Sequence, residues 1–115
     1  MLAIRMMATK DRRSGLDRRR VRRAMVAREI EWENHAGRRR GTLSDISRRG
    51  CFVLASGDFA VGERLYIHLP LVTGSTLRLP AEVRTSIFEI GFAAQFRDLS
   101  NAEAEFLERF VELHQ

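Results

Sequence analysis

Six short strand-like segments, separated by turn residues, most constrain how this chain can fold. In residues 77–84 apolar side chains occupy every second position, namely Leu77, Leu79, Ala81 and Val83. A period of two places one face of a strand against a core. The predicted strands cover residues 25–33, 38–46, 51–55, 65–69, 77–84 and 90–97. Their spacing predicts a mainly β fold, a small six-stranded antiparallel barrel with a split, Greek-key-like arrangement.

The last part of the sequence changes to a helical period. Ser100 and Glu103 have the spacing of a capping box, which predicts a helix start. One apolar stripe follows, made of Phe106, Leu107, Phe110 and Leu113. We expect a C-terminal helix that covers one end of the barrel or an open edge, with an exposed partner surface as the alternative role of the stripe.

Three residues carry specific structural expectations. Trp32 shares a face with apolar neighbours, so we expect it to be a half-buried core residue. Cys51 is the only cysteine, which excludes an internal disulfide and a cysteine zinc cluster and favours a small buried strand residue. Pro80 cannot donate a ladder hydrogen bond, so it should lie on an edge or at a bulge. The histidines show no ligand spacing, and no metal site is expected.

The positive charge of the chain is concentrated in its first half. Residues 1–49 hold 15 Lys or Arg against 6 Asp or Glu, a net +9, whereas residues 50–115 hold 5 against 9, a net −4. Nearly all of these cations are arginine, whose planar fork suits phosphate and guanine. We expect a flexible basic N-terminal arm over residues 1–16 and one domain over residues 17–115.

Several classes of function are not expected. No apolar run approaches the roughly 20 residues that span a bilayer, and residues 1–10 lack the pattern of a signal peptide, which predicts a cytoplasmic protein. The sequence contains no Ser/His/Asp arrangement, metal set or phosphate-binding loop, so enzymatic activity is not expected.

A short turn between two predicted strands is the best candidate for a binding site. Asp45, Ser47 and Gly50 supply an acceptor, a hydroxyl group and an open backbone. An arginine block precedes them at residues 17–23 and supplies cationic forks. Together these residue types suggest an anionic ligand that carries a purine.

The order of these features resembles the PilZ-domain family over residues 17–113. Its RxxxR motif can be placed at Arg19 and Arg23, although Arg18 and Arg22 fit equally well, and its DxSxxG motif is matched by residues 45–50. The run Ile90-Gly91-Phe92-Ala93-Ala94-Gln95-Phe96 is similar to that family's glycine-containing strand before the terminal helix.

The resemblance implies a receptor for cyclic di-GMP, a ligand and not a cofactor, that regulates a bacterial output such as motility, adhesion or polysaccharide production. The implied contacts are Arg18, Arg19, Arg20, Arg23, Asp45, Ser47 and Gly50, with Arg84 as a residue that could stack on guanine. Arg18 and Arg20 would help to hold a second, intercalated ligand molecule. Arg48 and Arg49 are accessory candidates, and the protein partner is not identified.

Two other functions compete with this one. A small basic barrel could bind RNA or DNA non-specifically, but Phe52, Phe92 and Phe96 fall on predicted core faces and do not form a stacking surface. Nucleic acid is therefore not the expected partner. The other alternative is a PilZ-like adaptor that does not bind the nucleotide, against which the intact motif residues argue.

Overall fold

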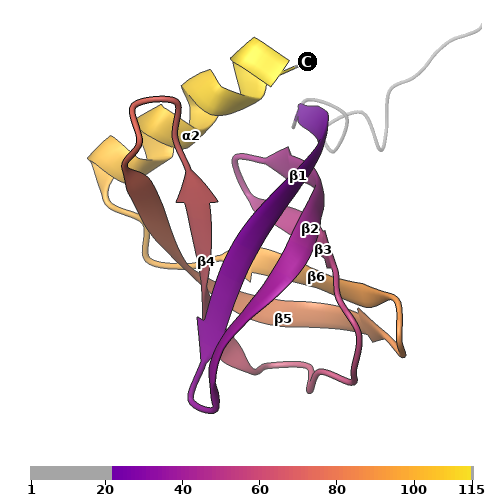
Figure 1. Cartoon of the computed structure of the whole chain (residues 1–115). Coiled ribbons are helices and arrows are strands. Elements are labelled where there is room, and N and C mark those ends of the chain that lie inside the picture. Colours follow the sequence, from indigo (N-terminus) through magenta and orange to yellow (C-terminus); the bar gives the residue numbers. More distant parts are fainter. Residues whose placement is uncertain (1–21, 115) are drawn as a thin grey trace, which may run out of the picture.

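A computed structural model describes residues 22–114 and shows a closed antiparallel barrel with one helix (Figure 1). Around the barrel the strands follow the order β1-β2-β3-β6-β5-β4, so two meanders are joined by the crossing from β3 to β4. The predicted barrel and terminal helix are confirmed. The elements are β1 (Arg23–Asn34), β2 (Gly37–Ser47), β3 (Gly50–Leu54), β4 (Arg64–Pro70), β5 (Thr76–Ile87), β6 (Gly91–Phe96) and α2 (Asn101–His114).

Bulges let the long strands curve enough to close the barrel. The register between β1 and β2 shifts between Met25 and Arg28, where Ala27 has a φ of 52°. Another shift, between Val83 and Thr85, occurs where β5 pairs with β6. An extra residue on one strand bends it and increases its twist, which a small barrel requires. The sequence pattern predicted the strands but not these shifts.

An aromatic cluster fills the centre of the barrel. Trp32 is only 1% exposed, so it is more deeply buried than expected. Its ring meets Phe59 and Phe92 edge to face, at centroid distances of 5.3 and 5.4 Å. Phe59 comes from the connection between β3 and β4, where no core residue was expected. Cys51 is buried in β3 as predicted.

Helix α2 packs against β1 and β2 and covers one end of the barrel (Figure 1). The predicted capping box is present: Ser100 N donates to Glu103 Oε1 at 2.9 Å, and Glu103 N donates to Ser100 Oγ at 3.1 Å. The predicted apolar stripe is partly wrong. Leu107 and Phe110 are buried together with Val111, but Phe106 and Leu113 remain exposed. Within residues 22–114, no helix is both long and apolar enough to cross a membrane.

Two positions in the second half of the barrel differ from the prediction. Ile90 was placed inside the sixth strand, but it lies in the β5–β6 turn and is 52% exposed. Pro80 lies neither at a barrel edge nor at a bulge. It faces Tyr66 of β4 and sits one residue beyond the β5–β6 pairing, which begins at Ala81. Its missing N–H therefore costs no ladder hydrogen bond to β6, while its carbonyl accepts from Arg97 N at 2.9 Å.

Candidate functional site

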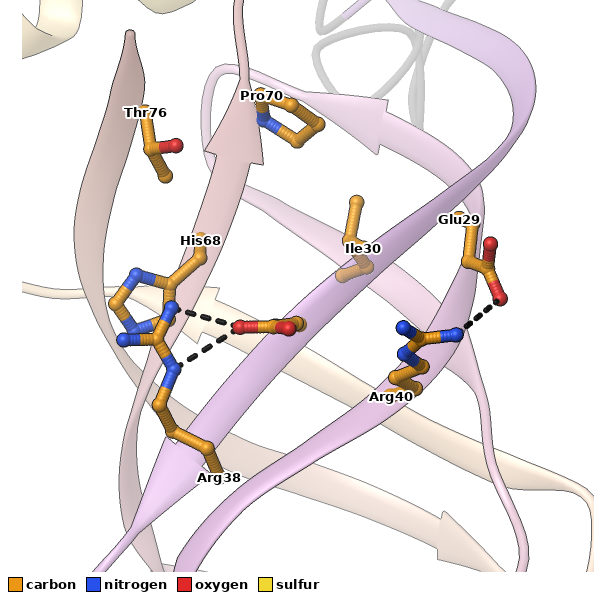
Figure 2. Close-up of a pocket in the computed structure, with 8 residues that line it drawn as sticks. Glu29, Ile30, Arg38, Arg40, His68, Pro70 and Thr76 are labelled. Carbon is orange, nitrogen blue, oxygen red and sulfur yellow. Dashed lines mark hydrogen bonds and ion pairs between the residues drawn. The ribbon is translucent and has the colours of Figure 1, made fainter.

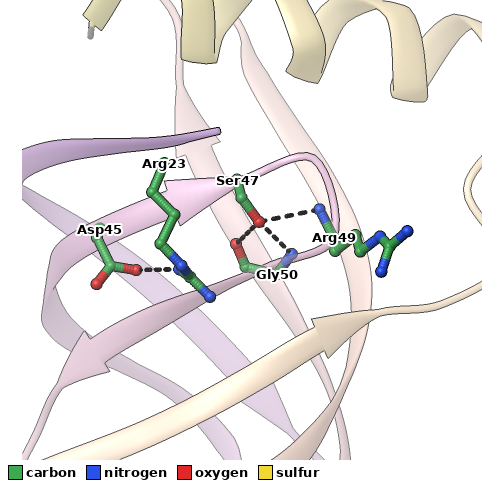
Figure 3. Close-up of polar contacts among 5 residues, drawn as sticks. All are labelled: Arg23, Asp45, Ser47, Arg49 and Gly50. Atoms are coloured by element: carbon green, nitrogen blue, oxygen red, sulfur yellow. Dashed lines mark hydrogen bonds and ion pairs between the residues drawn. The ribbon is translucent and has the colours of Figure 1, made fainter. Parts of the chain in front are cut away.

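The turn from Ser47 to Gly50 joins β2 to β3 and is held by the Ser47 hydroxyl (Figure 3). Ser47 Oγ accepts hydrogen bonds from Arg49 N at 3.1 Å and from Gly50 N at 3.3 Å, and it lies 3.4 Å from Gly50 O. The residue is 1% exposed. Ser47 therefore acts as the cap of the turn, and a direct contact between its hydroxyl and a ligand stays a prediction.

Gly50 is required by the neighbouring strand. A Cβ at this position would overlap the carbonyl oxygen of Ala94 in β6, which lies across the β3–β6 ladder. Its φ is not among the positive values. The sequence interpretation assigned this glycine to a tight turn and to ligand approach, whereas the structure shows that close packing of β3 on β6 already excludes a side chain.

Arg23 and Asp45 bring the two predicted motifs together. Arg23 Nη1 donates to Asp45 Oδ1 at 2.6 Å, a charge-assisted hydrogen bond between neighbouring strands β1 and β2 (Figure 3). The two side chains are 56% and 23% exposed, respectively, so both remain accessible. One N–H of the fork and one carboxylate oxygen are used, which leaves further donors and a second acceptor oxygen for a ligand.

A second ion pair connects the turn to the helix. Arg48 Nη1 lies 3.3 Å from Glu108 Oε2 of α2, and both side chains are about half exposed. These two residues line a depression of about 210 Å³ together with Arg22, Val111 and Glu112. Arg49 is also exposed and its guanidinium points away from Ser47 (Figure 3). The surroundings of the turn are thus rich in arginine, as predicted.

Arg84 lies two strands away from the turn on the same outer surface. Its Nη1 donates to Gln95 Oε1 at 3.0 Å, and Gln95 in β6 is directly opposite Gly50 in β3. Gln95 has an outward position, because its neighbours Ala94 and Phe96 are buried in the core. The structure therefore brings Arg84 onto the same outer face as the turn and fixes its direction through a residue that the sequence interpretation did not select.

The prediction that Phe52 belongs to the core is wrong. Phe52 is half-buried and lies outside the core cluster, whereas its neighbours Cys51 and Val53 are in it. It sits opposite Asp45 on β2 and Ala93 on β6. Phe92 and Phe96 are buried as predicted. We call the surface that carries Asp45, Gly50, Phe52, Gln95 and Arg84 the outer face.

Cys51 lies directly behind the outer face. Burial raises the pKa of its thiol to about 12, and the nearby Asp45 carboxylate acts in the same direction. Cys51 is therefore a neutral thiol and behaves as a small apolar residue under the turn. Among the residues that the structure describes, no group of three His, Cys, Asp or Glu side chains could hold a metal ion.

A depression of about 330 Å³ on β1, β2, β4 and the start of β5 offers a different environment (Figure 2). Its arginines are already matched by carboxylates, since Arg38 contacts Glu31 at 2.7 Å and Arg40 contacts Glu29 at 3.9 Å. His68 lies at its margin and is only 7% exposed. Two glutamates balance the two arginines of this lining, and no residue of the RxxxR or DxSxxG motif lies in it, so this surface is a weaker candidate for an anionic ligand than the outer face.

Glu33, His68 and Arg78 form a charged cluster next to this depression. His68 Nε2 is 2.6 Å from Glu33 Oε1, and Arg78 Nε lies 3.5 Å from the same oxygen. The hydrogen bond from His68 lowers the pKa of Glu33, and the charge of Arg78 adds to the effect. Arg78 also stacks on Tyr66, with the guanidinium carbon 3.5 Å from the ring centroid. This cluster holds β1, β4 and β5 together on the side away from the turn.

Some of the predicted ligand contacts lie outside the described residues, namely Arg18, Arg19 and Arg20, as does the predicted arm at residues 1–16. The sequence interpretation missed Gln95 and Glu108. Gln95 had been placed correctly on the outward side of its strand, but its role depends on the register between three strands. Glu108 carries no local signal that connects it with Arg48, because the two are 60 residues apart.

The family model of the PilZ domain matches residues 17–113. A search of the curated proteins gives no match.

The fold is similar to that of several solved structures. The PilZ domain of CeSA from a cellulose-synthesizing bacterium is 22% identical with a TM-score of 0.66, over 78% of this chain and 94% of that one. The PilZ domain of YcgR from Escherichia coli, solved with c-di-GMP, is 16% identical with a TM-score of 0.68, over 84% and 91%. The inhibitor of motility from Bacillus subtilis is 19% identical with a TM-score of 0.68; the match covers 84% of this chain and half of that protein.

Proposed function

We propose, because this chain belongs to the PilZ domain family, that it binds cyclic di-GMP at the Ser47–Gly50 turn and on the adjoining outer face. The observation that carries the proposal is the contact between Arg23 of the RxxxR motif and Asp45 of the DxSxxG motif at 2.6 Å. Residues far apart in the sequence thus form one polar centre. A solved PilZ domain of YcgR contains c-di-GMP, which supports the same ligand here.

The chemistry of the ligand matches this centre. Cyclic di-GMP combines phosphodiester anions with guanine bases, so its site needs both cations and hydrogen-bond acceptors. The free N–H groups of Arg23 can donate to phosphate oxygens or to the O6/N7 edge of guanine. The second oxygen of Asp45 can accept from the N1-H and N2-H donors of guanine. Each charge-assisted hydrogen bond contributes roughly 1.5 to 3 kcal/mol.

The rest of the outer face offers surfaces for a base to stack on. Phe52 presents a half-buried ring beside Asp45, and Arg84 presents a planar guanidinium that Gln95 holds at 3.0 Å. We propose that Arg84 stacks on guanine. Arg18, Arg19 and Arg20 would add cations from the segment before β1, which suits an intercalated ligand dimer with its larger negative charge. Ser47 and Gly50 act by holding the turn in shape.

We further propose that ligand binding changes the surface offered to a protein partner and so regulates a bacterial output. The Arg48–Glu108 pair gives the turn a direct contact with α2, at 3.3 Å. Any such regulation requires that the ligand bind one arrangement of these elements more tightly than another. Part of the binding free energy is offset by the ordering of side chains around the ligand.

Isothermal titration calorimetry of cyclic di-GMP into the full chain tests the proposal. Saturable binding near micromolar affinity is expected, which corresponds to about −8 kcal/mol. GMP and cyclic di-AMP serve as matched controls and should bind at least about tenfold more weakly, a difference of roughly 1.4 kcal/mol. Equal binding of all three nucleotides would contradict specific recognition of cyclic di-GMP.

Calorimetry also tests the two alternative functions, non-specific nucleic-acid binding and an adaptor that binds no nucleotide. A non-specific nucleic-acid binder would bind single-stranded RNA or DNA with an affinity that falls steeply as salt rises. An adaptor without a ligand would give no heat with any nucleotide while remaining folded by circular dichroism. We expect neither result, since the DxSxxG turn is intact and Arg23 and Asp45 remain accessible.

A further inference from the structure

An apolar groove lies between the β4–β5 loop and helix α2, and its lining includes no residue of the Ser47–Gly50 turn. Figure 1 shows this loop beside the helix. The groove encloses about 180 Å³, and its apolar lining consists of Leu71, Val72, Phe106, Phe110 and Leu113. Two of these residues are the members of the predicted helical stripe that the barrel does not bury. The helix therefore has more apolar surface than the barrel covers.

The walls of the groove are unusually exposed for apolar residues. Val72 is 95% exposed, Leu113 is 81% exposed and Phe106 is 40% exposed. Single exposed apolar residues are common, but here they gather around one cavity, which is typical of an interaction site. The surface is thus suited to a partner that removes these side chains from water.

The groove is also held in shape by the residues around it. The Phe110 ring forms its floor, stacked on His114 at a centroid distance of 4.1 Å. His114 Nδ1 lies 2.8 Å from Phe110 O, which fixes this stack. Arg28 Nη1 donates to Pro70 O at 3.2 Å and ties β1 to the start of the loop. The loop is closed by hydrogen bonds from Leu71 N and Gly74 N, at 2.9 and 3.0 Å. A preformed groove lowers the free-energy cost of ordering side chains and loops when a partner binds.

The polar side chains around the apolar lining include two arginines. Arg28, Arg109 and His114 line the groove, and no carboxylate does. Within residues 22–114, Arg109 forms no ion pair. An occupant with carboxylates beside an apolar anchor would complement both the shape and the charge of the groove.

We propose that this groove docks a segment of a partner protein that inserts one large apolar side chain and places carboxylates against Arg28 and Arg109. The volume fits such an anchor, because an apolar cavity of about 150 Å³ accommodates a benzene ring. The side chain would contact Val72 and Leu113 and rest on Phe110. This site is separate from the cyclic di-GMP site and does not depend on that proposal.

Other occupants match the groove less well. Residues 1–21 of this chain hold seven Lys or Arg against two Asp, so they carry the same sign of charge as the rim. A second copy docked groove to groove would bring the two sets of cations together. An anionic membrane would extend past the groove to the exposed carboxylates of Glu105, Glu108 and Glu112 on the same helix, whereas a short segment inside the groove meets only its lining, which contains no carboxylate. A concave cavity also favours an inserted side chain over a flat bilayer surface.

The proposal is tested by nuclear magnetic resonance titration of the full, isotope-labelled chain with two synthetic peptides. One is a capped hexapeptide with a central Phe-Leu pair and two Glu residues on each side, and the other has Lys in place of every Glu. The acidic peptide should shift the amide signals of residues 71–74 and 106–114. We expect it to bind at least tenfold more tightly than the basic peptide.

Matched variants separate the groove from the rest of the surface. Val72→Asp and Arg109→Glu should each weaken the acidic peptide at least tenfold. Val61→Asp is the control, because Val61 is also exposed (69%) but does not line the groove. All three variants should give the circular dichroism spectrum of the parent chain, since the altered side chains are exposed.

Four results would overturn the proposal. They are equal affinity for the two peptides, signal shifts confined to other surfaces, equal loss in Val61→Asp, and absence of binding at millimolar acidic peptide. Sedimentation of the chain with vesicles that contain anionic lipid, abolished by Val72→Asp, would assign the groove to membranes instead. A dimer in analytical ultracentrifugation that Val72→Asp dissociates would assign it to a second copy.

Discussion

Arg23 and Asp45 lie 22 residues apart, and their side chains meet at 2.6 Å across neighbouring strands. The carboxylate orients the guanidinium, and each group keeps unused hydrogen-bonding capacity that faces the solvent. The pair is partly exposed, and ion pairs of this kind contribute only about 0 to 1 kcal/mol to stability. Its main consequence is therefore the placement of a cation and an acceptor next to one another.

Substitution of Asp45 separates recognition from folding. Asp45→Asn replaces a carboxylate oxygen by an N–H donor, which cannot accept from guanine. We expect cyclic di-GMP affinity to fall about tenfold or more, roughly 1.4 kcal/mol, while the free energy of unfolding changes by no more than about 1 kcal/mol. Calorimetry and urea denaturation measure the two quantities. Unchanged ligand affinity would show that Asp45 does not contact the ligand.

Ser47 should matter for the stability of the turn. Ser47→Ala removes the acceptor for the buried backbone N–H of Gly50 and the part-buried N–H of Arg49, so we expect a loss of about 1 to 3 kcal/mol in urea denaturation. Ser44→Ala is the control, because Ser44 is half-buried and its side chain makes no hydrogen bond within residues 22–114. It should change stability by less than about 0.5 kcal/mol. Equal effects of both substitutions would contradict the capping role.

Gly50→Ala should destabilise the barrel even without a ligand. The added methyl group would overlap the carbonyl oxygen of Ala94, and overpacking of this kind costs typically about 1 to 3 kcal/mol. Thermal unfolding of the ligand-free chain measures the loss. A variant as stable as the parent chain would mean that β3 and β6 can separate without cost, which would refute the packing argument for this glycine.

The Glu33–His68 contact predicts a pH dependence of stability. Because His68 lowers the pKa of Glu33 in the folded state, the contact stabilises the fold above the ordinary pKa of a glutamate. That stability is lost as the pH falls through the lowered value. Glu33→Gln should therefore be less stable than the parent chain at neutral pH, and the difference should shrink below about pH 4.

Denaturant unfolding as a function of pH measures this effect. Glu105→Gln is the control, because Glu105 is exposed and forms no ion pair in the described part of the chain. The free energy of unfolding of Glu105→Gln should equal that of the parent chain at every pH. A gap between Glu33→Gln and the parent chain that stays constant down to acidic pH would contradict the assignment to Glu33.

The fold was readable where the side-chain pattern was regular. Strict alternation in residues 77–84 predicts which side of β5 faces the core, and Leu79, Ala81 and Val83 are buried accordingly. The run from Cys51 to Ala55 is apolar at every position, so it contains no period from which the outward position of Phe52 could be inferred. Ile90 was misplaced because β5 extends to Ile87 and leaves Ile90 in the turn.

The candidate site was only partly readable for a related reason. The motif residues Asp45, Ser47 and Gly50 were identified from their spacing, but the buried hydroxyl of Ser47 and the strand behind Gly50 depend on tertiary packing. The contacts made by Gln95 and Glu108 depend on strand register and on where α2 lies. Sequence spacing determines neither the strand register nor the position of α2. Gln95 contacts Arg84 of β5, and Glu108 contacts Arg48 of the β2–β3 turn, so both partners come from other parts of the chain.

Calorimetric titration of cyclic di-GMP into Arg23→Ala tests the central claim most directly. Arg40→Ala is the matched control, since Arg40 is 77% exposed and lines the other depression with only a 3.9 Å contact to Glu29. Both variants lose one positive charge. We predict at least about tenfold weaker binding for Arg23→Ala, roughly 1.4 kcal/mol, and parent-like binding for Arg40→Ala. Equal affinities of the two variants would contradict a ligand site built on Arg23 and Asp45.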